Sequence, residues 1–169
     1  MAAGATYEPI ATTTLGADTS NITFSSISSS YTDLKLVVTA FQNSGGSVWL
    51  ALQFNGDTAT NYSFTRVYGN GTSAASSTTG TLAQMRTGFV YPSTTIPALC
   101  IANIFSYAGS TNKTVLSQVP NDANGAGQVN YSVGLWRSTS AITSIKILFE
   151  GGTNLLAGST ATLYGIKAA

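Results

Sequence analysis

Six carboxylates and no histidine are all that this 169-residue chain offers for acid–base or metal chemistry. Histidine is the commonest general base and the commonest zinc ligand, so its absence removes most hydrolase mechanisms and most zinc sites. A serine or threonine nucleophile would also lack an activating base. The carboxylates are scattered, with no spacing that pairs two of them: Glu8, Asp18, Asp33, Asp57, Asp122 and Glu150. We therefore expect no catalytic residue and no cofactor, and predict that the chain is not an enzyme.

Two loops carry side-chain oxygens of the kind that calcium prefers, 55–57 and 121–124. Asparagine and aspartate also favour turns without any ion, and each loop holds few carboxyl or amide groups at useful spacing. We interpret both as turns and expect no metal site. The single cysteine, Cys100, lies in an apolar run and can form no intramolecular disulfide, so we expect it to be a small buried hydrophobe.

Charge is scarce along the whole chain. Only 8% of the residues are charged, and seven Lys+Arg against six Asp+Glu leave a net charge of +1. Such a surface cannot neutralise many phosphates, which argues against binding to nucleic acid. The sequence contains no run of eighteen apolar residues, so it predicts no membrane-spanning helix. Serine and threonine supply the polarity, with 46 of the 169 positions. Because a nearly neutral domain tends to associate, we expect its surface to be covered by copies of itself or by partners.

Hydrophobic residues alternate with a period of two almost everywhere, which predicts β-strands. In the run 33–41, for example, Leu34, Leu36 and Val38 fall on one face. About nine or ten such runs are separated by Gly- and Asn-rich turns. The pattern predicts an all-β fold, an antiparallel two-sheet β-sandwich that is jelly-roll-like. A single up-and-down barrel is the alternative.

The length fits one domain over residues 1–169. Residues 1–18 are interpreted as an N-terminal attachment segment. Residues 72–88 begin with a Ser/Thr/Ala/Gly run without a large apolar residue to anchor a strand, so a long exposed loop is expected there.

Two tryptophans are candidates for contact with other molecules. Trp49 and Trp136 each have the opposite parity to the apolar residues of their strands, which for Trp136 are Val129, Tyr131, Val133 and Leu135. Exposed aromatic side chains fill hot spots at protein interfaces or stack on sugar rings. Three alternatives stay open for both: an interface, internal packing, or glycan contact. In the N-terminal segment, Tyr7, Ile10 and Leu15 are further interface candidates.

Several phrases along nearly the whole chain resemble short virion structural proteins of tailed bacteriophages. They are 7–15 (YEPIATTTL), 27–34 (ISSSYTDL), 54–57 (FNGD) with 61–63 (NYS), 134–139 (GLWRST) and 161–169 (ATLYGIKAA). The resemblance implies no catalytic residue.

Phage proteins of this kind are head-decoration (cement) proteins or tail-fibre domains, commonly β-sandwich homotrimers. The resemblance therefore implies a homotrimer on the capsid exterior that binds the major capsid protein. The alternative is a tail-fibre or receptor-binding domain that recognises host surface glycan and contacts other tail proteins. The chain has no coiled-coil heptads and no fibrous shaft, which favours decoration.

Overall fold

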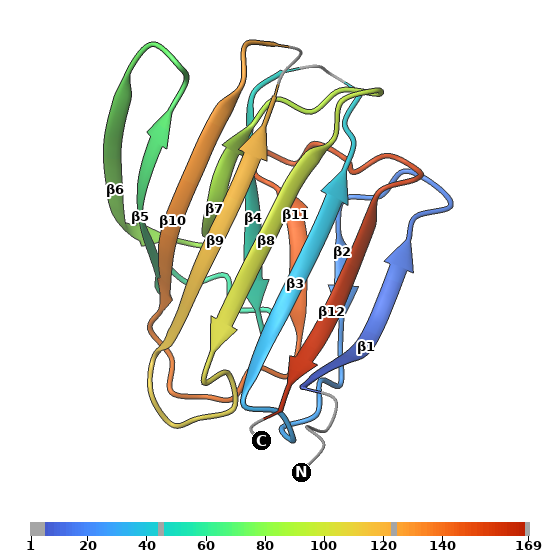
Figure 1. The fold of residues 1–169 in the computed structure, drawn as a ribbon. Coiled ribbons are helices and arrows are strands. Elements are labelled where there is room, and N and C mark those ends of the chain that lie inside the picture. The colour runs from blue at the N-terminus through green and yellow to red at the C-terminus, as the bar shows by residue number, and fades with distance from the viewer. Residues whose placement is uncertain (1–5, 44–45, 123–124, 168–169) are drawn as a thin grey trace.

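The computed structural model describes residues 6–43, 46–122 and 125–167. These residues form two antiparallel sheets that pack face to face (Figure 1), which confirms the predicted antiparallel β-sandwich. There are twelve strands where nine or ten were expected. They are β1 (Tyr7–Thr14), β2 (Ile22–Phe24), β3 (Asp33–Ala40), β4 (Val48–Phe54), β5 (Tyr62–Gly69), β6 (Ala74–Leu82), β7 (Met85–Val90), β8 (Ala98–Phe105), β9 (Lys113–Asn121), β10 (Gln128–Trp136), β11 (Ile145–Phe149) and β12 (Thr160–Ile166). The described residues contain no helix long and apolar enough to cross a membrane.

Eight of the strands have the order of a jelly roll. The smaller sheet runs β2-β11-β4-β7, and the larger sheet begins β1-β12-β3-β8. This is the order that two nested Greek keys produce when the chain crosses repeatedly between two four-stranded sheets. The larger sheet then continues with β9, β10, β5 and β6. We name these four strands the sheet extension.

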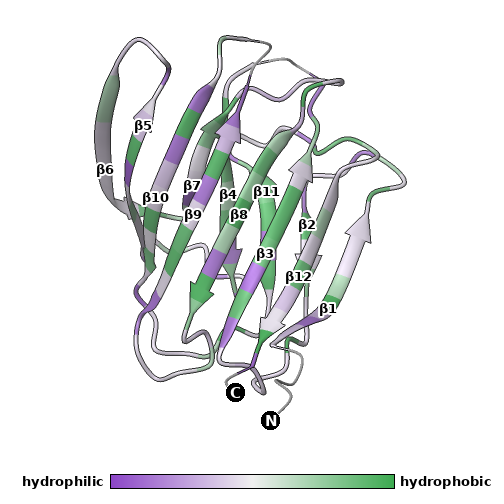
Figure 2. Cartoon of the chain, in the orientation of Figure 1, coloured by the Kyte–Doolittle hydropathy of each residue, from purple (hydrophilic) through white to green (hydrophobic). Residues whose placement is uncertain are grey.

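The core between the sheets follows from the period-two pattern. In β3, Leu34, Leu36 and Val38 are buried, while the residues between them are only half-buried. In β4, Leu50 and Leu52 point to the same core from the smaller sheet. Figure 2 shows the result by hydropathy: β3 and β8, at the centre of the larger sheet, are largely apolar, whereas β1 at its edge is mostly not.

The turn after β4 is held by its own side chains, as the sequence predicts. Asn55 and Gly56 both have positive φ angles, 52° and 67°, which asparagine and glycine tolerate best. The Asn55 side chain accepts hydrogen bonds from the backbone N–H groups of Thr143 and Ser144 at 2.8 and 3.1 Å. The turn is thereby joined to the segment that enters β11.

Residues 72–88 are not a long loop, and that prediction is wrong. They contain β6 and most of β7. Apart from Leu82 at its end, β6 consists of small residues and is exposed along most of its length, so no burial pattern marks it as a strand in the sequence. In β7 the period of two is broken, because the pairing with β4 skips Thr87 as a β-bulge.

The bulge at Thr87 joins the smaller sheet to the sheet extension. The Thr87 carbonyl accepts a hydrogen bond from the Ser117 hydroxyl of β9 at 3.0 Å and another from the Ser132 hydroxyl of β10. All three residues are buried. A carbonyl displaced from the ladder by the bulge therefore keeps its hydrogen bonds inside the sandwich.

The backbones of β7, β9 and β10 also approach closely. A Cβ added at Gly88 would lie 2.6 Å from the Cβ of Val119, and one added at Gly134 would lie 2.4 Å from the sulfur of Met85. At these two positions the interior has no room for a side chain, which accounts for Gly88 in β7 and Gly134 in β10.

Cys100 is buried in β8 with 1% of its surface exposed, which confirms the sequence prediction. Burial raises the pKa of its thiol to about 12. Since the thiolate is the reactive form, native protein at pH 8 should react with a thiol reagent only as fast as it unfolds. We expect labelling to be complete in urea and near zero without it, as read by mass spectrometry. Rapid labelling of the folded protein would contradict this burial.

Candidate interaction surface

The outward face of the larger sheet exposes large apolar side chains. Val129 and Val67 are 64% and 59% exposed. Tyr131 is the antiparallel partner of Val67 across β10 and β5, so the two side chains lie next to each other. The other exposed large apolar residues of this face and of β1 are Tyr7, Leu99, Phe105 and Val133. We name these seven exposed side chains the outer apolar face; three of them, Val67, Val129 and Tyr131, lie together on the neighbouring strands β5 and β10.

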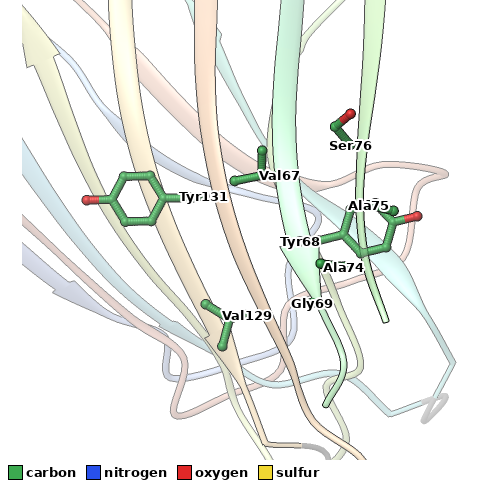
Figure 3. Close-up of a pocket in the computed structure, with 8 residues that line it drawn as sticks. All are labelled: Val67, Tyr68, Gly69, Ala74, Ala75, Ser76, Val129 and Tyr131. Atoms are coloured by element: carbon green, nitrogen blue, oxygen red, sulfur yellow. The ribbon is translucent and has the colours of Figure 1, made fainter. Parts of the chain in front are cut away.

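A shallow groove marks the end of the outer apolar face beside β6. It has a volume of about 650 Å³, and Figure 3 shows its residues on neighbouring strands. Val67 comes from β5, Val129 and Tyr131 come from β10, and Ala74 and Ser76 come from β6. The Tyr131 hydroxyl accepts a hydrogen bond from the Gln118 amide at 2.6 Å. The groove thus has an apolar floor and a polar atom at one side.

The orientation of β10 is the reverse of the sequence interpretation. Val129, Tyr131 and Val133 point outward, and Trp136 points into the core with 2% of its surface exposed. Of the three alternatives for the interface candidate Trp136, this burial favours internal packing over an interface or glycan contact. The physical reason for the orientation of β10 is the close approach of β7 at Ser132 and Gly134, which requires small residues at these two inward positions. Trp136, at the end of β10, packs against Phe54 and Tyr62 instead.

Trp49 has the predicted parity, opposite to Val48, Leu50 and Leu52, and is half-buried, while Ala51 and Gln53 on its own face are buried. Its ring is already in contact with the same chain. The centroid lies 4.9 Å from that of Phe89 and 5.2 Å from that of Phe64. The guanidinium groups of Arg66 and Arg86 lie 4.5 and 4.7 Å from it. These contacts close the side of the sandwich where β5 passes β7, and they favour internal packing among the three alternatives.

The two arginines on Trp49 differ in their partners. Arg86 forms a bidentate ion pair with Glu150, with N–O distances of 2.7 and 3.0 Å. Arg66 donates instead to the Ser77 hydroxyl at 3.0 Å and to the side-chain amide oxygen Oδ1 of Asn130 at 2.8 Å. Burial lowers the pKa of Arg66.

The predicted N-terminal attachment segment contains an edge strand. β1 pairs along its length with β12. Of the three interface candidates, Tyr7 is exposed, with the Lys35 ammonium 5.5 Å from its ring centroid. Ile10 and Leu15 are partly buried against the core. Tyr7 therefore stays available for contact with another molecule, whereas Ile10 and Leu15 are largely occupied by packing.

The carboxylate of Asp57 lies at the centre of a cluster of hydrogen bonds. Its carboxylate accepts hydrogen bonds from the Asn61 amide at 2.9 Å, the Trp136 indole at 2.7 Å and the Ala59 backbone N–H at 2.9 Å. The Tyr62 hydroxyl is close by, donating to the Asp57 backbone carbonyl, and burial raises its pKa to about 12. The carboxylate oxygens of Asp57 thus accept hydrogen bonds from other groups of the protein, as is expected if residues 55–57 form a turn.

The hydrogen bonds from Asn61 and Trp136 hold the pKa of Asp57 below its ordinary value. A carboxylate with a lowered folded pKa contributes stability above its unfolded pKa and loses it as pH falls through the folded value. We expect the free energy of unfolding to fall below about pH 4. The Asp57→Asn variant should lose part of this acid dependence, as measured by urea unfolding from pH 3 to pH 7. An equally steep acid dependence in the variant would contradict the assignment.

Other carboxylates are also engaged, each at a different place. Glu8 pairs with Lys167 at 2.6 Å, and Asp18 and Asp33 accept from the backbone N–H groups of Ala157 and Ser106. Within the described ranges, no group of three acidic or sulfur side chains could hold a metal ion. These carboxylates therefore form hydrogen bonds and ion pairs that stabilise the fold, and the outer apolar face provides a surface for binding.

No family model, no curated protein and no solved structure matches this chain. The resemblance to virion structural proteins of tailed bacteriophages therefore stays a prediction.

Proposed function

We propose that the chain is a non-enzymatic structural protein of a tailed-bacteriophage virion, a decoration (cement) protein bound to the outside of the head. The observation that carries this proposal is the outer apolar face, with side chains such as Val67, Val129 and Val133 exposed on a broad sheet. A large exposed apolar surface is typical of proteins whose surface is covered in an assembly. The engaged carboxylates and the lack of histidine support a role without catalysis.

In this proposal the outer apolar face lies against sibling copies and the major capsid protein. A homotrimer is the expected assembly, and binding only to assembled coat subunits stabilises the head by mass action. The exposed side chains that define the face are apolar, so the contact would depend little on ion pairs. Attachment should therefore persist when salt screens charges.

Electron microscopy of phage particles labelled with an antibody against the purified protein tests the location. We expect label on the head, before and after a wash in about 1 M salt, where the Debye length falls to about 3 Å. Absence of the protein from purified particles would overturn the proposal, and so would its release by salt alone. Label confined to the tail would overturn decoration in favour of the alternative.

The second candidate is a tail receptor-binding domain for host glycan. The exposed ring of Tyr131 in the groove beside β6 favours it, because aromatic rings stack on sugars. A glycan array with the purified protein separates the two functions. Binding that is lost in Tyr131→Ala would support the receptor-binding function, and no binding is expected of a decoration protein.

A further inference from the structure

The free edge of β6 is unlike the other sheet edges. β6 is nine residues long, ends the larger sheet and pairs only with β5 among the described strands. Its sequence, AASSTTGTL, contains no charged residue and no proline. Proteins usually protect an exposed edge with charge, proline, a bulge or short length, because unpaired N–H and C=O groups accept another strand.

The other edges show these protections. β1 contains Glu8 and Pro9 and has an irregular register beside Pro9. β2 has three residues. β7 carries Arg86 and the bulge at Thr87, and its face lies against β9 and β10. β6 is therefore the longest sheet edge without charge or proline. Its own register irregularity lies at its C-terminal end, between Thr79 and Leu82, and leaves residues 74–79 in regular pairing with β5.

The hairpin between β5 and β6 shows which backbone groups are free. The N–H of Asn70 bonds to the carbonyl of Ser73 at 3.2 Å. Hydrogen-bonded and non-hydrogen-bonded pairs alternate along an antiparallel ladder. Counting from this pair, Ala75 and Ser77 bond to β5, and the backbone groups of Ser76 and Thr78 point to the free edge.

We propose that β6 pairs with β6 of a second copy of this chain, antiparallel about a two-fold axis at Ser76, near the middle of the regularly paired residues 74–79. Such an axis places Ser76 beside its own copy, so a charge near the axis would face a like charge, and β6 has no charged residue. Its hydroxyl side chains suit cross-strand pairs. The same sheet already uses them, with Oγ–Oγ distances of 3.0 Å between Thr65 and Thr78 and 3.1 Å between Thr12 and Thr162.

The pairing joins two larger sheets edge to edge and places the two grooves beside the contact. The regularly paired residues 74–79 span about 20 Å, and one sheet thickness of about 10 Å gives about 200 Å² per copy. This is below the roughly 800 Å² per partner of a standard interface, so we expect weak association. The contact adds a two-fold axis whether or not the outer apolar face also makes a trimer, and it does not depend on a virion location.

Sedimentation of the purified chain from about 1 μM to 1 mM, the range of weak complexes, tests the pairing. The mass should rise to an even multiple of the 17.4 kDa chain. Ser76→Pro removes an N–H from the free edge and none from the β5 ladder, so its mass should be half that of the original chain. Ser76→Ala, which keeps the N–H, is the matched control and should behave as the original chain.

Two further measurements guard against misfolding of the proline variant. Ser76→Lys keeps every N–H and should also halve the mass, because two like charges meet at the contact. In the unmodified protein, amide hydrogen exchange at Ser76 and Thr78 should slow as concentration rises, while exchange at Ala75 stays constant. A monomer at every concentration, an unchanged mass in both variants, or concentration-independent exchange would each overturn the pairing.

Discussion

Trp136→Ala should lower the free energy of unfolding by about 3–5 kcal/mol, the usual cost of removing a buried large aromatic side chain. The ring is 2% exposed and packs against Phe54 and Tyr62, with centroid distances of 5.6 and 6.2 Å. Its indole N–H also donates to Asp57 at 2.7 Å. Removing it leaves both a cavity and a carboxylate that has lost a donor.

Urea unfolding measures this effect, with Trp136→Phe as the matched control. Phenylalanine keeps a ring in the core and loses the hydrogen bond, so we expect a smaller loss than for alanine. If Trp136→Ala left stability unchanged and altered only the mass of the assembly, the residue would be an interface residue and its buried position would be refuted.

Gly88→Ala should destabilise the fold by about 1–3 kcal/mol or more, as overpacking of a filled core does. The added Cβ would lie 2.6 Å from the Cβ of Val119, an atom next to the backbone of β9. A rotation of the Val119 side chain does not move that atom, so β7 and β9 must separate. Separation would also stretch the hydrogen bonds from Ser117 and Ser132 to the Thr87 carbonyl.

Gly16→Ala is the control for Gly88→Ala. No atom lies within 4 Å of a Cβ added at Gly16, and its φ is not positive. The control should be neutral or slightly stabilising, because alanine restricts the unfolded chain. Equal stability of the two variants in thermal unfolding would show that the sheets do not approach as closely at Gly88.

Much of the sandwich could be predicted where one face of a strand is larger and more apolar than the other. Leu34, Leu36 and Val38 are such a case, since only one face of β3 can fill the core. The burial of Cys100 in β8 is predicted in the same way. A hydrophobic pattern identifies strands wherever burial of large side chains is what selects the residues.

The pattern misleads where backbones pack closely. In β10, large residues such as Val129 and Tyr131 point outward, because β7 leaves room inside only for Ser132 and Gly134. Parity gives two faces and does not say which is inside, so the alternation in β10 could not place Trp136 in the core. The hydrophobic pattern does not identify β6 as a strand, because neither of its faces is buried. Only its pairing with β5 makes it a strand.

The sheet extension also determines where a fluorophore or affinity label can be attached to this molecule. β1 and β12 lie at one margin of the larger sheet, and β6 lies at the other (Figure 1). Seven strand spacings of about 4.8 Å put roughly 34 Å between these margins. A fluorophore or affinity label placed near Tyr7 or Ile166 would therefore sit far from β6, so a surface-immobilised chain could still present that margin to molecules in solution.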